Sequence, residues 1–428
     1  MGTIDILPLS HPLDACVRVP GSKSLTNRAL LLAALADGKT EIENALFSDD
    51  SQYFFRALQA LGVEVAMYPE EARMEVRGMD GRIPVQKAEL FVGNAGTAMR
   101  FLTAMLTLGN GEYILDGEPR MRERPIGDLV DALAQLGASV EAISDQGSAI
   151  CPPVKITASG LPGGRTKIAG DISSQFLSAL LMVAPYARAP VQIELTTGLN
   201  SKPYVDMTLA VMSGFGVEVQ REGYLRFMIR PCQYASPGTY QIEPDVSAAS
   251  YFFAAPALCG GRVCVERISR RSIQGDIAFL EVLARMGCTI EECHRGIQVT
   301  GTEDLRGIDV DMRDIPDTAQ TLAVLAPFAS TPTRIHGIAS ARVKESDRIS
   351  ATCNELARLG VRVEEHEDGM TIHPCAEIQP ASVQTYNDHR MAMAFSLMGL
   401  RVPGLAIQEP GCVAKTFPNF FDVLDGLR

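Results

Sequence analysis

The chain has 428 residues, of which 46% are hydrophobic and 21% are charged. This composition is typical of a globular protein, and the length predicts two or more domains, since one domain usually has ~100 to 200 residues. The formal net charge of −12 disfavours nucleic acid as a partner unless basic residues cluster locally. Every apolar stretch is shorter than the ~20 residues of a membrane span, so we expect a soluble protein without a membrane partner.

The sequence contains neither a secretory signal nor a metal-binding motif. The first twenty residues lack the cationic start and apolar run of a secretory signal, which predicts a cytoplasmic location. Ten cysteines occur without a CxxC, and six histidines without an HxxxH or HExxH. We therefore expect reduced thiols, and neither a zinc site nor a disulfide framework.

The first predicted element is a strand, TIDILPL, which no helix precedes. A helix rich in Ala and Leu on every face begins near Ser24 and is expected to be buried. A second helix, amphipathic, ends at Gly62 before the short apolar segment VEV. Glycine readily adopts the left-handed conformation that follows many helices, so Gly62 is expected to end this one.

The same pair of helices recurs along the chain at intervals of 70 to 79 residues. Further buried helices are expected to begin near Gly96, Ser173, Ser247, Asp317 and Asp388, and further amphipathic helices to end at Gly137, Gly216, Gly287 and Gly360. Between them, alternating segments such as EVQREGYLRFMIRP and TRIHGI predict strands. The chain is thus expected to be an α/β protein of six repeats.

Six repeats divide into two lobes of three. We expect the chain to cross between lobes near residues 20–21 and again near residues 240–245. The first lobe would then comprise residues 21–240, inserted into a second lobe of residues 1–20 plus 241–428. Because FFDVLDGLR ends the last repeat with a helix and no strand, the two termini are expected to complete one repeat together.

Polar residues gather at the starts of the buried helices, in PGSKSLTNR, GNAGTAMR, GDISSQ, PDVSAAS, IPDTAQ and YNDHR. Such helix starts offer free N–H groups and partial positive charge, which suit phosphate or carboxylate. A simpler explanation is that Ser24, Asp317 and Asp388 are N-caps. For Ser247 alone we prefer that explanation.

Cations accompany several of these helix starts, although acids are normally favoured there. They include Lys23, Arg28, Arg100, Arg124, Lys344, Arg348, Arg390 and Lys415. In RMRERPIGDL a surface cluster is the alternative, and only one of its arginines need face a ligand. In RVKESDR the alternative is a solvated helix entry with internal ion pairs, and His389 is expected to be structural.

The recurrence of cations in an acidic protein predicts a site for two anionic small molecules. No GxxxxGK[ST] motif, and no GxGxxG after a strand, supports nucleotide phosphoryl transfer or hydride transfer. No GxSxG motif supports a serine hydrolase.

Seven motifs in order, from residue 20 to 419, resemble the 5-enolpyruvylshikimate-3-phosphate synthase family: PGSKSLTNRALLLAALA, NAGTAMR, RERPIGDL, GDISSQFLSALL, RVKESDR, NDHRMAMA and AKTFPNF. The resemblance implies an enolpyruvyl transferase fold with two lobes, each of three βαβαββ units around buried helices. The substrates would bind in the cleft between lobes, and closure would exclude water.

The family joins phosphoenolpyruvate to the 5-hydroxyl of shikimate 3-phosphate with release of phosphate, in the pathway to chorismate and aromatic amino acids. By resemblance, the shikimate 3-phosphate ligands are Lys23, Ser24, Arg28, Ser173, Ser174, Gln175, Ser201, Tyr204, Asp317 and Lys344. The phosphoenolpyruvate ligands are Lys23, Gly96, Arg124, Gln175, Arg348, Arg390 and Lys415. Arginine can grip either anionic group with two parallel hydrogen bonds.

The reaction implied by the family needs an acid and a base but no metal or organic cofactor. Asp317 would accept the hydroxyl proton, and either Glu345 or Lys23 would protonate the methylene carbon. Two residues depart from the family pattern: Phe101 stands where proline is usual, and Ser340 where asparagine commonly binds substrate. Inhibition by glyphosate is expected, although Phe101 could shift the helix that carries Gly96, and a monomer is expected.

Two other functions compete with this hypothesis. The related transferase that acts on UDP-N-acetylglucosamine shares the fold, but it carries a cysteine in the loop that corresponds here to GEPRMRERPIGDL, which has none. An inactive anion-binding module is the other alternative, because a fold alone does not establish activity. The presence of Asp317, Glu345 and Lys23 argues against an inactive module.

Overall fold

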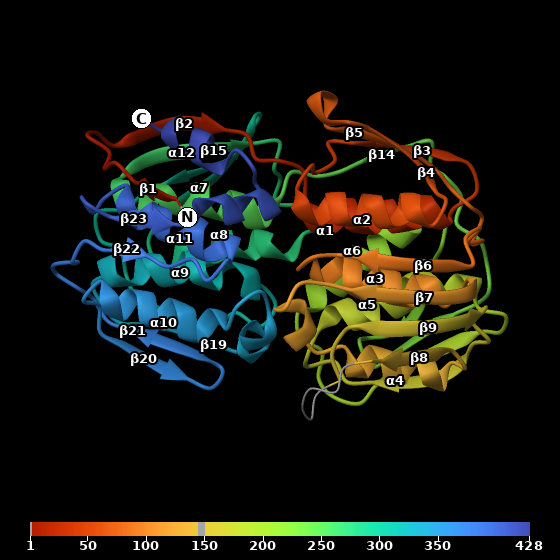
Figure 1. Cartoon of the computed structure of the whole chain (residues 1–428). Helices are drawn as coiled ribbons and strands as arrows, with labels where there is room; N and C mark the ends of the chain where they lie inside the picture. Colours follow the sequence, from red (N-terminus) through yellow and green to blue (C-terminus); the bar gives the residue numbers. More distant parts are fainter. Residues whose placement is uncertain (1, 144–149) are drawn as a thin grey trace. The chain divides into compact units, whose positions relative to one another are not determined.

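The computed structural model describes residues 2–143 and 150–428, and the chain divides into two compact units (Figure 1). The inserted unit is Gly21–Ile242, and the terminal unit combines Met1–Pro20 with Glu243–Arg428. Among the described residues, no helix has both the length and the apolar character needed to cross a membrane.

The inserted unit contains helices α1 to α6 and strands β3 to β14. Its helices are α1 (Lys23–Leu35), α2 (Asp49–Ala60), α3 (Gly96–Leu106), α4 (Gly127–Gln135), α5 (Ser174–Val183) and α6 (Lys202–Gly214). Its strands are β3 (Lys39–Glu43), β4 (Glu64–Tyr68), β5 (Arg73–Arg77), β6 (Lys87–Phe91), β7 (Asn110–Asp116), β8 (Ser139–Ala142), β9 (Val154–Ser159), β10 (Gly164–Ile168), β11 (Val191–Leu195), β12 (Gln220–Glu222), β13 (Arg226–Ile229) and β14 (Thr239–Gln241).

The terminal unit contains the remaining elements. Its helices are α7 (Val246–Cys259), α8 (Phe279–Arg285), α9 (Ala319–Leu325), α10 (Arg348–Arg358), α11 (His389–Gly399) and α12 (Phe420–Asp425). Its strands are β1 (Thr3–Asp5), β2 (Leu13–Val17), β15 (Gly261–Glu266), β16 (Thr289–Cys293), β17 (Gly296–Thr300), β18 (Asp309–Asp311), β19 (Thr333–His336), β20 (Val363–His366), β21 (Gly369–Ile372), β22 (Ser382–Val383) and β23 (Ala406–Gln408).

One strand arrangement recurs in the sheets formed by the described residues. In the order β6-β7-β9-β8, the first pair is parallel and the other two pairs are antiparallel. The same arrangement holds for β10-β11-β13-β12, β14-β3-β5-β4, β2-β15-β17-β16 and β18-β19-β21-β20. The sheet β22-β23-β1 has three strands, with β22 parallel and β1 antiparallel to β23.

Two leading strands are exchanged between the units where the chain crosses. Strand β2 precedes α1 in the sequence but pairs with β15 of the terminal unit, whereas β14 precedes α7 but pairs with β3 of the inserted unit. The division predicted between residues 240 and 241 therefore falls inside β14, and the inserted unit extends to Ile242. Strand pairing, rather than the start of the next helix, sets this boundary.

The amphipathic helices end as the sequence predicts. Gly62, Gly137, Gly216, Gly287 and Gly360 all have φ between 80° and 112°. At α2, the N–H of Gly62 bonds to the carbonyl of Gln59 and that of Val63 to the carbonyl of Leu58. The other four helices repeat these two bonds, which define the Schellman motif and satisfy carbonyls at the helix end.

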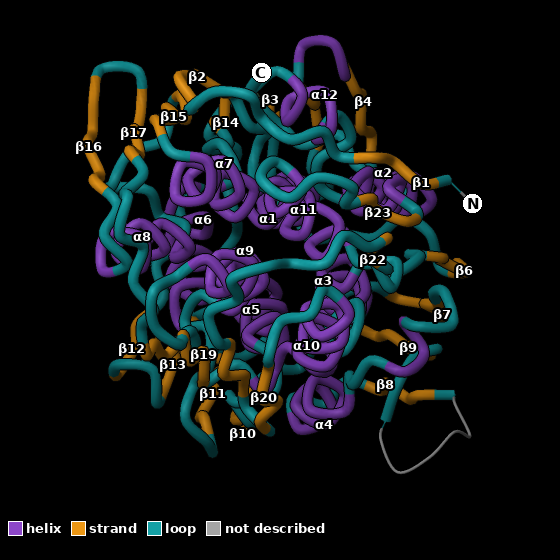
Figure 2. The backbone as a smooth tube through the Cα atoms, turned by 90° about the vertical axis from the view of Figure 1, so that its left-hand side faces the viewer, coloured by secondary structure: helices purple, strands orange, loops and turns teal. Residues whose placement is uncertain are grey.

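The Ala- and Leu-rich helices are buried, also as predicted. Every residue of α3 is buried, as are eleven of the thirteen residues of α1. In the terminal unit, α7, α9 and α11 contact one another, and the strands lie around them (Figure 2). Each unit has its own hydrophobic core, so each places the starts of its buried helices on a rigid support.

Candidate active site

The start of α1 presents Lys23 within the inserted unit. Ser22, not Ser24, caps the helix, because the Ser22 hydroxyl accepts a hydrogen bond from the N–H of Leu25. The Lys23 Nζ lies 3.4 Å from the buried carboxylate of Asp50, which the first turn of α2 supplies. Ser24 is thus left available for a role other than capping.

Arg28, one turn further along α1, is buried with 1% of its surface exposed. Its guanidinium donates to the hydroxyls of Thr208 and Ser178 and to the carbonyls of Ser24 and Tyr204, at 2.8 to 3.3 Å. No carboxylate of the described residues lies within ion-pair distance, and burial lowers the Arg28 pKa to about 10. A buried cation held by neutral groups is ready to receive an anion.

Phe101 packs against this cation. Its ring centroid is 5.4 Å from the Arg28 guanidinium carbon, and Phe101 is fully buried. Helix α3 is continuous from Gly96 to Leu106 around this position. Phe101, which stands where the family usually has proline, therefore makes a cation–π contact with Arg28.

The start of α3 is matched to Arg124. The Arg124 guanidinium donates to the carbonyl and side-chain oxygens of Asn94 at 3.1 and 3.0 Å. A Cβ atom at Gly96 would lie only 2.5 Å from an Arg124 nitrogen, so the arginine can pass over this helix start only because residue 96 is glycine. Arg124 is 5% exposed.

The other arginines near Arg124 bond to residues of the protein surface or to a backbone carbonyl. Arg120 pairs with Glu123 and Arg122 with Asp116 at the surface, at 2.8 and 2.6 Å. Arg100 is buried and donates to the carbonyl of Pro125 at 2.8 Å. Of the three arginines in the RMRER segment, Arg124 is the one that is buried beside a helix start, and its role as a ligand stays a prediction.

Two loops of the inserted unit carry the predicted serines. Ser173 caps α5 by accepting from the N–H of Gln175 at 3.3 Å, and Ser174 begins the helix. Ser201 precedes α6 with φ of 57°, and Tyr204 lies in the first turn of that helix. The side chain of Asn200 donates to the carbonyl of Asp171 at 2.7 Å, which ties the two loops together.

Side-chain hydrogen bonds bring these helix starts together. Asn27 on α1 donates to Thr97 on α3 at 2.6 Å, and Arg28 on α1 reaches Ser178 on α5 and Thr208 on α6. The first two turns of α1, α3, α5 and α6 therefore form one polar group within the inserted unit. Of the ten predicted ligands of this unit, nine lie on these helices or at their N-caps, and Arg124 lies outside them.

In the terminal unit, Asp317 lies at the centre of a group of cations. It stands in a 3-10 turn, Pro316–Thr318, before α9, and so is not the N-cap that one explanation of the sequence allowed. Its carboxylate accepts from Lys344 Nζ at 2.5 Å, Arg348 at 3.1 Å and Arg390 at 2.7 Å. Three separate segments of sequence, which carry Asp317, Lys344 with Arg348, and Arg390, meet at this carboxylate.

Arg348 is held on several sides. Asp388, at the N-cap of α11, accepts from Arg348 Nε at 2.8 Å and from a terminal nitrogen at 3.2 Å. Glu345 accepts from the same terminal nitrogen at 2.8 Å. Arg348 is 3% exposed and begins α10, so two buried carboxylates fix the guanidinium beside Asp317.

Burial and the neighbouring charges shift the pKa values of Asp317 and Lys344. Burial would raise the pKa of Asp317, but Arg390, Lys344 and Arg348 outweigh burial and hold that pKa well below its usual range. Burial lowers the pKa of Lys344, although Asp317 opposes the shift. Asp317 is therefore ionised at neutral pH, and anions that compete for its cations would raise its basicity.

The segment RVKESDR divides into two faces. Arg342 pairs with Asp347 and Glu365 at 2.9 and 2.8 Å on the partly exposed side. Lys344, Glu345 and Arg348 turn inward to the group around Asp317. The internal ion pairs that the sequence offered as an alternative are present at Arg342, and the role of the inward-facing residues as ligands stays a prediction.

Three carboxylates, two in the terminal unit and one in the inserted unit, contact or lie near predicted site residues but were not predicted as functional. Asp388 was interpreted as an N-cap, which it is, since it accepts from the Arg390 N–H at 2.9 Å, but it also pairs with Arg348. Asp50 was missed beside Lys23. Asp276 is buried, accepts from the Ser247 hydroxyl, and has a pKa raised to about 6 by burial and the nearby charge of Asp317. Asp245, not Ser247, caps α7.

The remaining predicted residues lie in the same unit. Lys415 ends a 3-10 segment, Pro410–Lys415, that packs against α11, and it is 9% exposed. His389 is buried at the start of α11. Ser340 is half-buried in a 3-10 segment, Ala339–Val343, just before Lys344.

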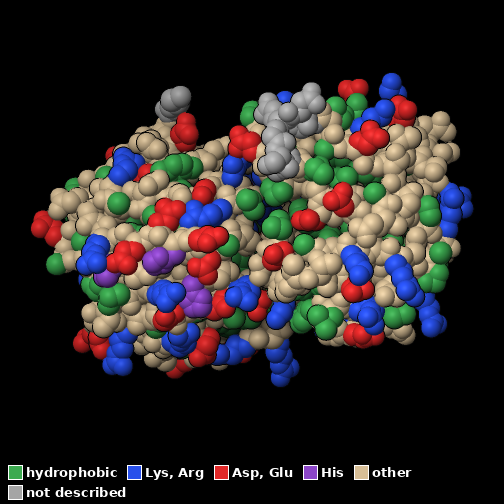
Figure 3. Space-filling view, turned by 90° about the horizontal axis from the view of Figure 1, so that it is seen from below, with side chains coloured by type: hydrophobic (Ala, Val, Ile, Leu, Met, Phe, Trp, Pro, Cys, Tyr) green, Lys and Arg blue, Asp and Glu red, His purple; other side chains and the backbone are tan. Residues whose placement is uncertain are grey.

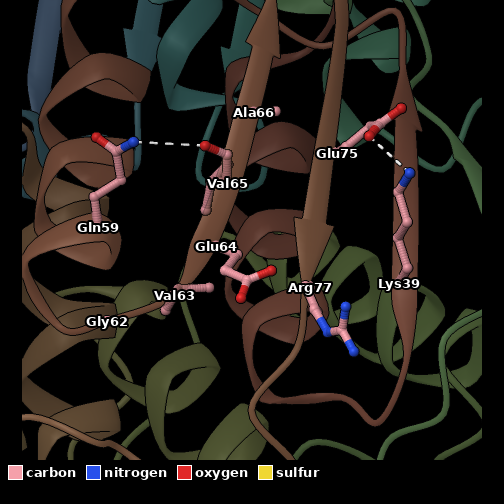
Figure 4. Close-up of a pocket in the computed structure, with 9 residues that line it drawn as sticks. All are labelled: Lys39, Gln59, Gly62, Val63, Glu64, Val65, Ala66, Glu75 and Arg77. Carbon is pink, nitrogen blue, oxygen red and sulfur yellow. Dashed lines mark hydrogen bonds and ion pairs between the residues drawn. The ribbon is translucent and has the colours of Figure 1, made fainter.

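A large cavity elsewhere in the inserted unit does not coincide with these residues. It has a volume of about 630 Å³ and is lined by residues of β3, β4 and β5 and the end of α2, among them Lys39, Glu64, Glu75 and Arg77 (Figure 4). Lys39 pairs with Glu75 at 2.7 Å. On the face of the molecule seen in Figure 3, acidic and basic side chains are intermixed rather than gathered by sign.

A model of the family EPSP synthase (3-phosphoshikimate 1-carboxyvinyltransferase) matches residues 9–424 of the chain. The chain belongs to this family. Its relatives named 3-phosphoshikimate 1-carboxyvinyltransferase include one from a Nostoc species, 50% identical over 98% of each chain. Another, from Shewanella denitrificans, is 51% identical over 96% of this chain and 95% of the relative.

Solved structures agree with the family. EPSP synthase from Acinetobacter baumannii is similar with a TM-score of 0.81 and 26% identity, over 99% of this chain and 98% of that one. The enolpyruvyl transferase NikO from Streptomyces tendae shares the fold, with a TM-score of 0.75 and 17% identity over 99% and 96% of the chains. The activity of the chain is that of its family, transfer of the enolpyruvyl group of phosphoenolpyruvate to shikimate 3-phosphate.

Proposed function

We propose that two clusters of polar residues supply the substrate ligands and the acid–base groups of this transferase. One cluster lies at the starts of α1, α3, α5 and α6, and the other surrounds Asp317. The observation that carries the proposal is the position of Asp317, whose carboxylate is shared by Lys344, Arg348 and Arg390. The anionic groups of a substrate can replace Asp317 as the partner of these three cations. The Asp317 carboxylate, once released from the cations, can then accept a proton.

Phosphoenolpyruvate carries a carboxylate and a phosphate, and the proposed ligands are suited to both. They are Lys23, Gly96, Arg124, Gln175, Arg348, Arg390 and Lys415. Arg124 and Arg348 are already oriented by Asn94 and Asp388, so little conformational entropy is lost when they bind an anion. The N–H groups at the start of α3 add partial positive charge at Gly96.

Shikimate 3-phosphate offers a phosphate, a carboxylate and ring hydroxyls. The proposed ligands are Lys23, Ser24, Arg28, Ser173, Ser174, Gln175, Ser201, Tyr204, Asp317 and Lys344. The serines at the start of α5 suit the phosphate, because N–H groups and hydroxyls converge there. Arg28, which is buried among neutral partners, suits a carboxylate.

The chemistry proceeds by addition and elimination. The 5-hydroxyl oxygen forms a bond to C2 of phosphoenolpyruvate, its proton passes to Asp317, and C3 takes a proton to become a methyl group. In the second step the methyl group returns a proton, the double bond re-forms and the C2–O bond to phosphate breaks. The fixed cations stabilise the phosphate and carboxylate charges throughout.

The group that protonates C3 is either Glu345 or Lys23. The Glu345 carboxylate accepts a hydrogen bond from Arg348 at 2.8 Å, and in this assignment it would take back the methyl proton during elimination. In the other assignment, the Lys23 ammonium gives its proton to C3 and becomes a neutral amine, and its Nζ lies 3.4 Å from the Asp50 carboxylate.

Three further features belong to this proposal. Glyphosate, an anion that can engage the same cations, is proposed as an inhibitor competing with phosphoenolpyruvate. Phe101 supports Arg28 and leaves the start of α3 regular, which supports sensitivity. A monomer in the cytoplasm stays the prediction from the sequence.

The proposal is tested by phosphate release from phosphoenolpyruvate with purified protein. We expect release with shikimate 3-phosphate, none with UDP-N-acetylglucosamine, and inhibition by glyphosate that phosphoenolpyruvate reverses. Release only with the nucleotide sugar would assign the chain to the related transferase. Release with neither acceptor would support the inactive anion-binding module.

A further inference from the structure

The segment that delivers Asp388 and Arg390 to the site has an unusual backbone. Tyr386 and Asn387 have φ of 54° and 53°, so two consecutive residues that are not glycine adopt the left-handed conformation. Asp388 then caps α11, and Arg390 follows in its first turn. A bulky residue such as Tyr386 occupies this conformation at a cost in free energy, so surrounding contacts must hold it there.

The side chain of Glu355 supplies these contacts. Its Oε1 accepts from the Tyr386 hydroxyl at 2.9 Å, and its Oε2 accepts from the N–H of Gln384 at 3.0 Å. Arg358 completes the set with a bond to Oε2 at 2.6 Å. Glu355 is 1% exposed, so it was removed from water to make these bonds.

Glu355 and a proposed substrate ligand lie on the same helix. Arg348 begins α10 and bonds to Asp388, and Glu355 lies two turns further along α10 and bonds to the turn before Asp388. Helix α10 is therefore attached to residues 384–388 at two points. The left-handed turn between these points sets the direction in which α11 begins.

We propose that Glu355 is a positioning residue for phosphoenolpyruvate binding, which holds the left-handed Tyr386–Asn387 turn so that Asp388 and Arg390 meet Arg348 and Asp317. Glu355 itself is not among the proposed ligands. The inference rests on the proposed function, because it takes Arg390 and Arg348 as ligands of phosphoenolpyruvate.

Two substitutions separate hydrogen bonding from charge. Glu355→Met keeps the length of the side chain but removes both acceptors, and we expect the KM for phosphoenolpyruvate to rise about tenfold while the KM for shikimate 3-phosphate stays within twofold. Glu355→Gln keeps an oxygen for the Gln384 N–H and an amide that can donate to the Tyr386 oxygen. We expect it to restore the KM for phosphoenolpyruvate to within threefold of wild type.

Arg358→Gln is the matched control, because it removes the ion pair with Glu355 and leaves both bonds to the turn. We expect both KM values within twofold of wild type. If Glu355→Met does not fold, Tyr386→Phe tests the same contact by removing one donor. We expect Tyr386→Phe, made in the otherwise unchanged protein, to raise the KM for phosphoenolpyruvate about threefold over wild type.

Arg390→Lys distinguishes the two proposals. A KM for phosphoenolpyruvate raised by Arg390→Lys but unchanged by Glu355→Met and Tyr386→Phe would overturn the positioning role alone. Equal rises in both KM values for Glu355→Met would show a general structural role and would also overturn it. An unchanged KM in Arg390→Lys would overturn the proposed function and this inference with it.

Discussion

The carboxylate of Asp388 holds the guanidinium of Arg348 with bonds of 2.8 and 3.2 Å, and it also caps α11 through the N–H of Arg390. One fully buried side chain thus fixes a helix start and a cation of the site. Breaking a buried ion pair costs ~3 to 5 kcal/mol, because the remaining charge is left unpaired.

Asp388→Ala should therefore lower the free energy of unfolding by about 4 kcal/mol, from the lost pair and the lost cap together. Urea titration followed by circular dichroism measures this change. The control is Asp304→Ala, which removes an exposed pair with Arg306 and should cost less than ~1 kcal/mol. Equal losses in the two variants would contradict this account of Asp388.

Arg124 and Arg122 offer a second matched pair. Arg124→Lys should raise the KM for phosphoenolpyruvate about tenfold, because lysine cannot keep both bonds to Asn94 while facing the start of α3. Arg122→Lys, at the surface beside Asp116, should leave that KM within twofold. Steady-state kinetics with shikimate 3-phosphate saturating measures both. If Arg122→Lys raised the KM for phosphoenolpyruvate more than Arg124→Lys does, the assignment of Arg124 as a phosphoenolpyruvate ligand would be wrong.

Asp276 should make stability depend on pH in an unusual direction. Its folded pKa of about 6 lies above the ordinary value near ~4. The folded state therefore binds more protons than the unfolded state between these values, and this contribution is present below pH ~4 and lost as pH rises through about 6. Asp276→Asn should be more stable than wild type at pH 8, by up to about 3 kcal/mol.

The advantage of Asp276→Asn should shrink toward pH 4, where the wild-type carboxyl is protonated. Urea titrations of both proteins at pH 4, 6 and 8 follow the difference. A constant difference at all three values would show that Asp276 does not titrate in this range.

The glycines that end the amphipathic helices allow a test of backbone conformation alone. Gly216 has φ of 84°, and an added Cβ would meet no other atom within 4 Å, so Gly216→Ala should cost about 1 kcal/mol from the left-handed conformation. Gly198 also has open space, and its φ is not in that region. Gly198→Ala should change the free energy of unfolding by less than about 0.5 kcal/mol in the same urea titration. An equal cost at both positions would argue against the conformational origin.

Much of the fold was predictable because its repeat depends on local rules. A Schellman motif requires a residue that tolerates positive φ, so Gly62 and its four counterparts are visible in the sequence. The exchange of β2 and β14 was not predictable in detail. Which strand lies beside β15 or β3 is decided by tertiary packing, which the local sequence of β2 and β14 does not encode.

The site was predictable in its cations and less so in its carboxylates. Lys23, Arg124, Arg348 and Arg390 stand out at helix starts, where positive charge is normally disfavoured. Asp388 does not stand out, because aspartate is an ordinary N-cap. Glu355, two turns into an amphipathic helix, has the sequence context of a surface residue, although its carboxylate is buried.

The role of Asp317 is the central claim, and the turnover of Asp317→Ala tests it most directly. Phosphate release at saturating substrates would be measured beside Asp314→Ala, a control at an exposed position nearby, with calorimetry to confirm that shikimate 3-phosphate still binds. We expect turnover to fall by a factor of ~100 or more in Asp317→Ala, as for loss of a general base, and to stay near normal in the control. Near-normal turnover in Asp317→Ala, with binding intact, would contradict the account.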